Sequence, residues 1–175
     1  IKDYPKIKMN YLSTDDDRYV AAQGLKLVRK IMLETETFKK YQPEEYRPGL
    51  HIKDDEELDR IRRATQITSE SFCEMLKYCS PGTGEWELAA ALEFGFRKRG
   101  ASGTAYPTIV GSGSNSCVLH YSDNSRRMEA GDLVLVDGGA EVDLYAGDIT
   151  RTFPVSGSFT PPQKAVYEVV QRAHR

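Results

Sequence analysis

The sequence lacks an excess of charge of either sign, and it lacks long apolar runs. Its 24 lysine and arginine residues are matched by 26 aspartate and glutamate residues, which gives a net charge of −2. This balance argues against nucleic acid or a membrane surface as a partner. The longest apolar runs, such as residues 133–136, fall far short of the roughly 18 residues that a membrane-spanning helix needs. Hydrophobic residues make up 39% of the chain, which is enough for a buried core.

Cysteine is also scarce. The three cysteines, Cys73, Cys79 and Cys117, are an odd number without C-x-x-C spacing, so we expect free thiols in a reducing compartment. We predict a cytoplasmic location, with a mitochondrial one as the alternative. The sequence begins at Ile1 and shows no secretory pattern, so we expect a fragment or a processed form of a longer protein.

Apolar spacing predicts four helices. Three of them cover residues 19–33, 55–78 and 85–99, where apolar side chains recur every three or four positions. The fourth begins at Pro161, a residue that is favoured at the first helical position. The residues expected to cap these helix starts are Thr83 for the third helix, and Thr160 with Gln163 for the fourth.

Short apolar runs broken by glycine predict the strands. Residues 104–121 are strand-like with a tight turn at 110–113, and residues 133–137 and 145–155 form two further strands. Residues 7–12 alternate weakly and predict one more. Because the helices and strands do not alternate as in a βαβ repeat, we predict an α+β fold with a mainly antiparallel sheet.

Two aspartates accompany the last two strands. If residues 133–140 and 145–153 form an antiparallel hairpin that turns near 142–143, Asp137 and Asp148 lie opposite each other, with Cβ atoms about 4.5–5.5 Å apart. Two facing carboxylates repel each other unless a cation lies between them. Metal ions in two-metal hydrolases lie about 3.5–4 Å apart, a spacing that such a pair can bridge. Oxygen ligands favour Mn, Mg or similar hard ions.

Each candidate also has a purely structural interpretation. Asp137 and Asp148 can also be interpreted as ordinary turn or surface residues, because aspartate is common in both places. His120 follows an apolar run, as histidines at the rim of a core do. Its functional interpretation is proton handling or hydrogen bonding to a developing oxyanion. Spacing alone leaves both interpretations open.

Several motifs follow one another in a fixed order. They are EWELAA at 85–90, AYPTIVGSG at 105–113, HYS at 120–122, GDLVLVDGG at 131–139 and YAGDITRTFP at 145–154. Together they resemble aminopeptidase P, which belongs with prolidase, creatinase and methionine aminopeptidase to the pita-bread group. The spacing of 17 residues from His120 to Asp137 and of 11 from Asp137 to Asp148 also fits. The resemblance covers about residues 50–175.

The resemblance implies a role for each motif residue. Asp137 would bind one of two divalent metal ions, Mn in the first place with Zn or Co as alternatives, and Asp148 would bridge both ions. A metal-bridging hydroxide would attack the scissile carbonyl of a peptide with proline at position two. His120 would hydrogen-bond the substrate or the tetrahedral intermediate. The positions expected to line or orient the site are Tyr106, Thr150 and Arg151.

The resemblance also implies which parts of the site this chain lacks. The family's site takes a histidine and two glutamates from a second, pseudo-symmetric half of the fold, and His174 is in the wrong place to substitute. We therefore expect residues 51–175 to form the first half of the catalytic domain, and residues 1–50 the tail of an N-terminal domain with its linker. We expect this chain alone to have little or no peptidase activity. An apolar sheet face left open in a half-fold predicts dimerisation or aggregation, and we expect the full-length protein to be a homo-oligomer.

Three alternatives share the same fold. A prolidase-type dipeptidase would cleave only dipeptides, and a mitochondrial intermediate-cleaving peptidase would trim residues without needing proline. A non-catalytic pita-bread module would bind peptides without hydrolysing them. Such modules have typically lost the metal ligands, so His120, Asp137 and Asp148 argue against this last alternative.

Overall fold

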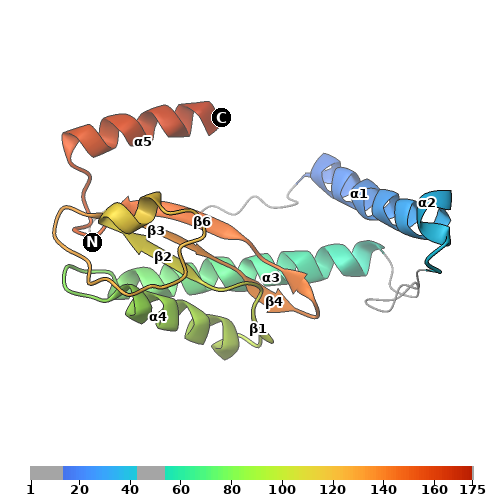
Figure 1. The fold of residues 1–175 in the computed structure, drawn as a ribbon, viewed down its shortest axis with the longest axis horizontal. Coiled ribbons are helices and arrows are strands. Elements are labelled where there is room, and N and C mark those ends of the chain that lie inside the picture. The colour runs from blue at the N-terminus through green and yellow to red at the C-terminus, as the bar shows by residue number, and fades with distance from the viewer. Residues whose placement is uncertain (1–13, 43–53, 175) are drawn as a thin grey trace.

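The computed structural model describes residues 14–42 and 54–174 (Figure 1). The predicted strand at 7–12 lies outside the described residues. The helices are α1 (Asp15–Glu34), α2 (Glu36–Lys39), α3 (Asp54–Met75), α4 (Glu85–Lys98) and α5 (Pro161–His174), with short 3-10 turns η1 (Leu76–Tyr78) and η2 (Gly113–Cys117). The strands are β1 (Gly103–Thr104), β2 (Ile109–Ser112), β3 (Leu133–Gly138), β4 (Ala140–Val142), β5 (Tyr145–Ala146) and β6 (Ile149–Pro154). The α+β fold that the sequence predicts is confirmed.

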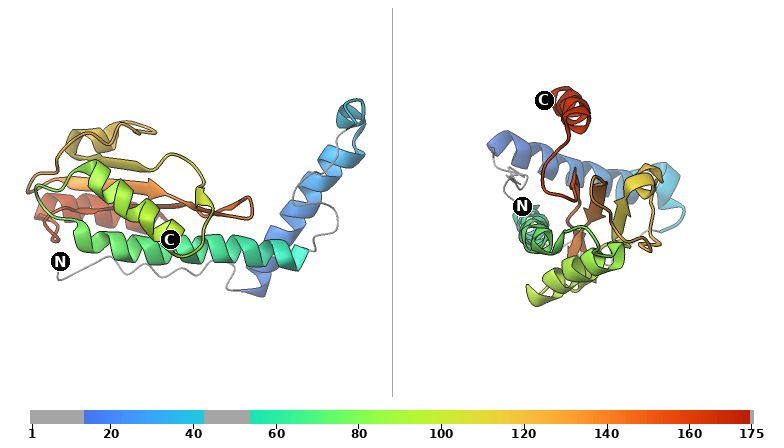
Figure 2. Two further views of the ribbon diagram at one scale, coloured as in Figure 1. Left: turned by 90° about the horizontal axis from the view of Figure 1, so that it is seen from below. Right: turned by 90° about the vertical axis from the view of Figure 1, so that its left-hand side faces the viewer.

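Helices α3 and α4 form one layer beside the strands (Figure 2). Both were predicted from periodicity, and α3 continues through η1 to the expected end at Tyr78. The prediction that Thr83 caps α4 is wrong, because Gly84 occupies the N-cap position and no side chain makes the cap bond. The Thr83 hydroxyl instead donates a hydrogen bond to the Tyr78 carbonyl, 3.1 Å away.

Helix α1 begins earlier than its apolar stripe indicates. Thr14 accepts a hydrogen bond from the Asp17 N–H, and the Asp17 side chain accepts one from the Thr14 N–H, which completes a capping box. Near its C-terminal end, Arg29 donates to both carboxylate oxygens of the buried Glu57 on α3, at 3.0 and 3.1 Å. The Tyr145 hydroxyl donates to the same carboxylate at 2.6 Å, so Glu57 joins α1, α3 and β5.

Helix α5 starts where the sequence predicts. The Gln163 Oε1 atom accepts a hydrogen bond from the Thr160 N–H at 2.9 Å, which is one half of the predicted capping box. Its Nε2 atom donates to the Gly131 carbonyl and so ties the start of α5 to the turn before β3. Along α5 the side chains of Val166, Val169 and Val170 are exposed.

The strands form two antiparallel sheets, in the orders β2-β3-β6 and β1-β4-β5. Strands β3 and β4 are consecutive and are interrupted only at Gly139, opposite the break at 147–148 between β5 and β6. The strand-like stretch at 104–121 is therefore only partly strand. After β2, Gly113 takes a φ of 53° and the chain turns into η2, because Ser116 Oγ bonds back to the Gly113 carbonyl.

The register of the last hairpin differs by two positions from the prediction. Asp137 lies opposite Thr150, not Asp148, and the same register continues through Val142 opposite Tyr145. The hairpin turns at Asp143 and Leu144, which have φ values of 50° and 73°, as a two-residue type I′ turn requires. The prediction near 142–143 was wrong because neither turn position carries the glycine that usually marks this turn.

Alternation along β3 separates two faces. Val134, Val136 and Gly138 are buried on the face toward the helices, where an added Cβ at Gly138 would meet Leu92 of α4. Leu133, Leu135 and Asp137 are only partly buried on the opposite face. The core lies between the helix layer and the first face, and its largest fully buried side chains include Phe72, Met75, Leu88, Leu92 and Phe96. Among the described helices, none has the length and apolar character needed to cross a membrane.

Candidate active site

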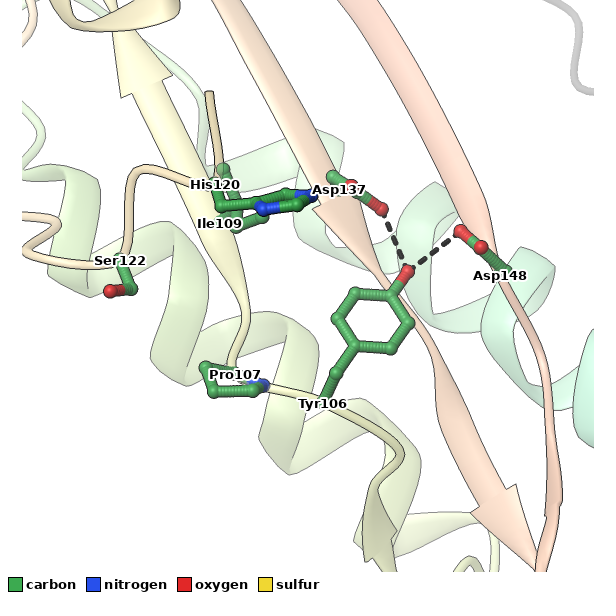
Figure 3. Close-up of a pocket in the computed structure, with 7 residues that line it drawn as sticks. All are labelled: Tyr106, Pro107, Ile109, His120, Ser122, Asp137 and Asp148. Carbon is green, nitrogen blue, oxygen red and sulfur yellow. Dashed lines mark hydrogen bonds between the residues drawn. The ribbon is translucent and has the colours of Figure 1, made fainter. Parts of the chain in front are cut away.

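A pocket of about 390 Å³ opens beside strands β2 and β3. Figure 3 shows Tyr106 and Asp148 at one end of this pocket and His120 over Ile109 near Asp137. The pocket is lined by Tyr106, Pro107, Ile109, His120, Ser122, Asp137 and Asp148. Four of the six predicted site residues therefore meet in one hollow, although they come from positions 106 to 148 of the chain.

Asp137 and Asp148 lie on the same face of the hairpin. Because Asp148 is two positions from Thr150, the partner of Asp137, the two aspartates are diagonal neighbours rather than an opposed pair. A shift of two positions preserves the face, since side chains alternate with a period of two. The prediction of a direct pair is corrected, while both carboxylates still reach one hydroxyl group.

That hydroxyl group belongs to Tyr106. Its oxygen lies 2.7 Å from Asp137 Oδ1 and 2.8 Å from Asp148 Oδ1, as the dashed lines in Figure 3 show. Burial raises the pKa of Tyr106 well above its ordinary value, and the hydrogen bonds to the two carboxylates raise it further. The phenol therefore stays protonated and acts as a donor throughout the physiological pH range.

The donor set around Tyr106 fits a divalent cation. A hydroxyl carries one proton, so only one of the two carboxylates can accept it at a time. In the part of the chain that the structure describes, no Lys or Arg forms an ion pair with either aspartate. Carboxylate oxygens with uncompensated charge are ligands that hard divalent ions prefer. Asp137 and Asp148 are the residues that would hold such an ion.

Two carboxylates are fewer ligands than a metal centre usually has. Within residues 14–42 and 54–174, no group of three or more histidine, cysteine, aspartate or glutamate side chains could hold a metal ion.

Two glycines allow close backbone approach beside the aspartates. An added Cβ at Gly139 would clash with the Gly147 carbonyl, and one at Gly147 would clash with Thr68 and Ala64 of α3. Thr68 also accepts a hydrogen bond from the Ala140 N–H at 2.9 Å. Thr68 could not be singled out from the sequence, because a threonine inside a helix carries no periodic or motif signal.

His120 reaches the pocket from the loop between η2 and β3. The residue is exposed and its φ is 54°, a conformation that non-glycine residues seldom adopt. Asn124, with a φ of 45°, fixes this loop to the β2 region by accepting from the Val110 N–H and donating to the Thr108 carbonyl, both at 2.8 Å.

Thr150 and Arg151 are outside the group that lines the pocket. Thr150 lies opposite Asp137 on the same face of the hairpin. Arg151 lies on the other face of β6, with Ile149 and Phe153, and its guanidinium donates to the Thr150 carbonyl at 2.7 Å.

A buried carboxylate on α4 completes the surroundings of the site. The Glu85 side chain has no exposed surface, and its two oxygens accept hydrogen bonds from the end of β2 and from the segment that follows it. Burial raises the pKa of Glu85, but bonds from the Arg126 N–H, from Ser112 and from Tyr121 outweigh burial and hold this pKa below its usual range. Glu85 was noticed only within its helix motif, since its partners are 27 or more positions away.

The helices on one face of the antiparallel sheet are those of a pita-bread fold, which this chain shares with solved aminopeptidase P structures. Residues 59–175 match the model of metallopeptidase family M24, and the chain belongs to this family.

Relatives of this chain include proteins named as Xaa-Pro aminopeptidases and Xaa-Pro dipeptidases. The chain is 45% identical over 130 residues to the Xaa-Pro aminopeptidase of Escherichia coli (strain K12), covering 72% of this chain and 30% of that protein. It is 41% identical over 129 residues to the human Xaa-Pro dipeptidase, covering 71% of this chain and 26% of that protein. The solved structure of Zn-substituted E. coli aminopeptidase P in complex with product matches 69% of this chain and 27% of its own, with 46% identity and a TM-score of 0.67. The chain thus spans less than a third of the length of these relatives.

Proposed function

We propose that the protein containing this chain is a metal-dependent aminopeptidase that releases the first residue from peptides with proline at position two. The observation that carries the proposal is the Asp137–Tyr106–Asp148 arrangement, in which two carboxylates share a single hydroxyl proton at the edge of a pocket. The similarity to an Xaa-Pro aminopeptidase at 45% identity supports the choice of substrate.

Asp137 and Asp148 would hold two divalent ions, with Mn as the first choice and Zn or Co as alternatives. Both carboxylates would supply oxygen ligands to these ions. When bound, such ions supply an activated hydroxide nucleophile near neutral pH and polarise the scissile carbonyl. The Tyr106 hydroxyl lies within hydrogen-bond distance of both ligands and orients them.

His120 would contact the substrate directly. Its imidazole lines the pocket beside Asp137, where it can donate a hydrogen bond to the carbonyl oxygen as negative charge develops there. Thr150 lies opposite Asp137 and would help to orient the Asp137 side chain. Arg151 would act through Thr150, whose carbonyl it contacts.

The domain organisation is part of the proposal. Residues 51–175 would be the first half of a pita-bread catalytic domain, and residues 1–50 the tail of an N-terminal domain with its linker. The remaining ligands would come from the second half, so this chain alone would have little or no activity. We also propose a homo-oligomer for the full-length protein. The three free thiols support a cytoplasmic location, with the mitochondrion as the alternative.

The direct test is manganese-dependent release of the first residue from an Xaa-Pro-containing tripeptide. We would compare the full-length protein, its Asp148→Ala variant, an Asp143→Ala control in the exposed hairpin turn, and the 175-residue chain. The proposal is supported if the full-length protein and the Asp143→Ala control are active while the Asp148→Ala variant and the 175-residue chain are not. Absence of activity in the full-length protein with every divalent metal supports a non-catalytic binding module instead.

A dipeptidase is the second candidate, because the human Xaa-Pro dipeptidase is 41% identical to this chain. The same assay separates the two activities when an Xaa-Pro dipeptide is compared with the tripeptide. Cleavage of the dipeptide alone would favour the dipeptidase. Release of residues from peptides without proline would favour an intermediate-cleaving peptidase.

A further inference from the structure

The loop that carries His120 has little regular structure of its own. Between β2 and β3 only the single 3-10 segment η2 is regular, and both His120 and Asn124 have positive φ values. Non-glycine residues in this conformation persist only where the surrounding structure fixes them. The position of His120 therefore depends on contacts made by its neighbours in the loop.

Several of these contacts converge on Glu85. One oxygen, Oε1, accepts from the Ser112 N–H and hydroxyl, both at 2.7 Å, and from the Asn115 amide at 3.1 Å. The other oxygen, Oε2, accepts from the Tyr121 hydroxyl and the Arg126 N–H, both at 2.9 Å. The partners span both sides of His120, and Tyr121 is its immediate neighbour.

The contacts require a carboxylate at this position. Both oxygens of Glu85 accept hydrogen bonds, and neither has to donate one. A carboxylate is the side-chain group that accepts at both of its oxygens. Glutamine has nearly the same shape, but its amide nitrogen would face a donor, either the Arg126 N–H or the Ser112 N–H. A buried donor left without an acceptor is unfavourable, so the loop would have to move.

Arg126 adds to the same hydrogen-bond network from the far end of the loop. Its guanidinium donates to the Ser112 hydroxyl at 2.9 Å and pairs with Asp132, which leads into β3. Asn115 also donates to the Tyr121 hydroxyl at 2.9 Å, so the two ends of the His120 segment are bonded to each other as well as to Glu85.

We propose that Glu85 is a positioning residue for His120, holding the loop at 113–126 so that the imidazole stays in the pocket. The catalytic consequence rests on the proposed function, whereas the effect on the loop does not. Glu85 does not touch the pocket, and it acts through Tyr121 and Asn115.

The test uses the full-length protein with Glu85→Gln and a matched control, Glu87→Gln. Glu87 is on the same helix but is exposed and forms only a 3.6 Å ion pair with Arg127. In Glu85→Gln we expect amide hydrogen exchange in residues 113–126 to quicken by roughly tenfold. We expect kcat for the Xaa-Pro tripeptide to fall by about a hundredfold with little change in KM, because a small misplacement of a reacting group costs that much. Glu85→Asp, which keeps both acceptors, should recover part of the loss.

If Glu85→Gln does not fold, Tyr121→Phe serves in its place, since it removes one donor to Glu85 from a half-buried ring and leaves the carboxylate intact. It should quicken exchange in the same segment and lower kcat in the same direction, but less. Unchanged exchange in both Glu85→Gln and Tyr121→Phe would overturn the proposal, as would faster exchange with an unchanged kcat.

Failure of the proposed function gives a different result. If the unmodified protein cleaves no peptide, the rate at which diethyl pyrocarbonate modifies His120, followed by mass spectrometry, replaces kcat as the measure. A rate altered in Glu85→Gln but not in Glu87→Gln supports the positioning role. An equal rate in all three proteins overturns it.

Discussion

The Ala140 N–H donates a hydrogen bond to the Thr68 hydroxyl 2.9 Å away, and both residues are completely buried. The bond fixes the start of β4 against α3, next to Gly139 and Gly147, which allow close backbone approach beside the two aspartates. The Thr68 hydroxyl in turn donates to the Ala64 carbonyl at 2.7 Å, so its capacity to accept is free for Ala140.

Thr68→Val should therefore destabilise the protein more than the small change in side-chain shape suggests. The substitution keeps the shape but leaves the Ala140 N–H buried without an acceptor, at a cost of about 1–3 kcal/mol. The measurement is the free energy of unfolding in urea. Thr65→Val is the matched control, because buried Thr65 bonds only to the Ile61 carbonyl of its own helix. Equal losses in the two variants would contradict this account.

The effect of the two aspartate charges on stability can be measured without an activity assay. In the absence of metal, Asp148→Asn should raise the melting temperature slightly, since it relieves the repulsion between two carboxylates that share one hydroxyl proton. Added Mn²⁺ should raise the melting temperature of the unmodified full-length protein and have much less effect on the variant. Asp143→Asn, in the exposed turn, should behave like the unmodified protein in both experiments. A manganese response that Asp148→Asn retains in full would argue against Asp148 as a ligand.

Acid should weaken the contact between the His120 loop and β3. Burial raises the pKa of Asp132, but the hydrogen bonds from the Arg126 guanidinium and the Glu129 N–H outweigh it and hold this pKa below its ordinary value. A carboxyl group whose pKa is lowered on folding stabilises the protein above its unfolded pKa, near 4, and this stabilisation is lost as the pH falls through the folded value.

Asp132→Asn should consequently lower stability at pH 7 and flatten the decline of stability below about pH 4. Urea unfolding between pH 2 and pH 7 measures both effects. Asp59→Asn is the control, because Asp59 is exposed and pairs only with Arg62 on the same helix. A decline of the same steepness in Asp132→Asn and in the unmodified protein would refute the assignment.

The thiols should separate into two classes. Burial raises the pKa of Cys79 to about 11, whereas Cys73 and Cys117 are exposed. At pH 8 a thiol reagent such as dithionitrobenzoate should modify Cys73 and Cys117 quickly and Cys79 only after unfolding, since the thiolate is the reactive form. Because the folded pKa of Cys79 is raised, its contribution to stability is complete below about pH 9 and is lost as the pH rises towards about 11. Rapid modification of Cys79 in the folded protein would show that it is not buried.

Much of the architecture could be predicted from local signals. Helical spacing located α1, α3 and α4, and the Thr160–Gln163 pair located α5, because these signals act within one or two turns of a helix. Four residues that the motifs singled out, Tyr106, His120, Asp137 and Asp148, line one pocket. Their metal and catalytic roles stay predictions until the experiments above are done.

The features that could not be predicted depend on distant contacts. The hairpin register was missed because Asp143 and Leu144 adopt positive φ without a glycine to mark the turn. Thr68 and Glu85 were missed because a buried polar side chain is identified by its partners, which for Glu85 are 27 to 41 positions away. The cap of α4 was displaced from Thr83 to Gly84 because the Thr83 hydroxyl bonds to Tyr78.

The two-residue turn at Asp143 and Leu144 lies outside the pocket, yet its length decides which side of the sheet the second aspartate occupies. The register stays constant from Val142–Tyr145 through the glycine break to Leu133–Pro154, so the hairpin transmits any change in the turn to both ends. One additional residue there, unless a β-bulge absorbed it, would turn Asp148 away from Asp137 and towards α3, since side chains alternate at every position. The site therefore tolerates an insertion at this turn only where the register between β3 and β6 is kept.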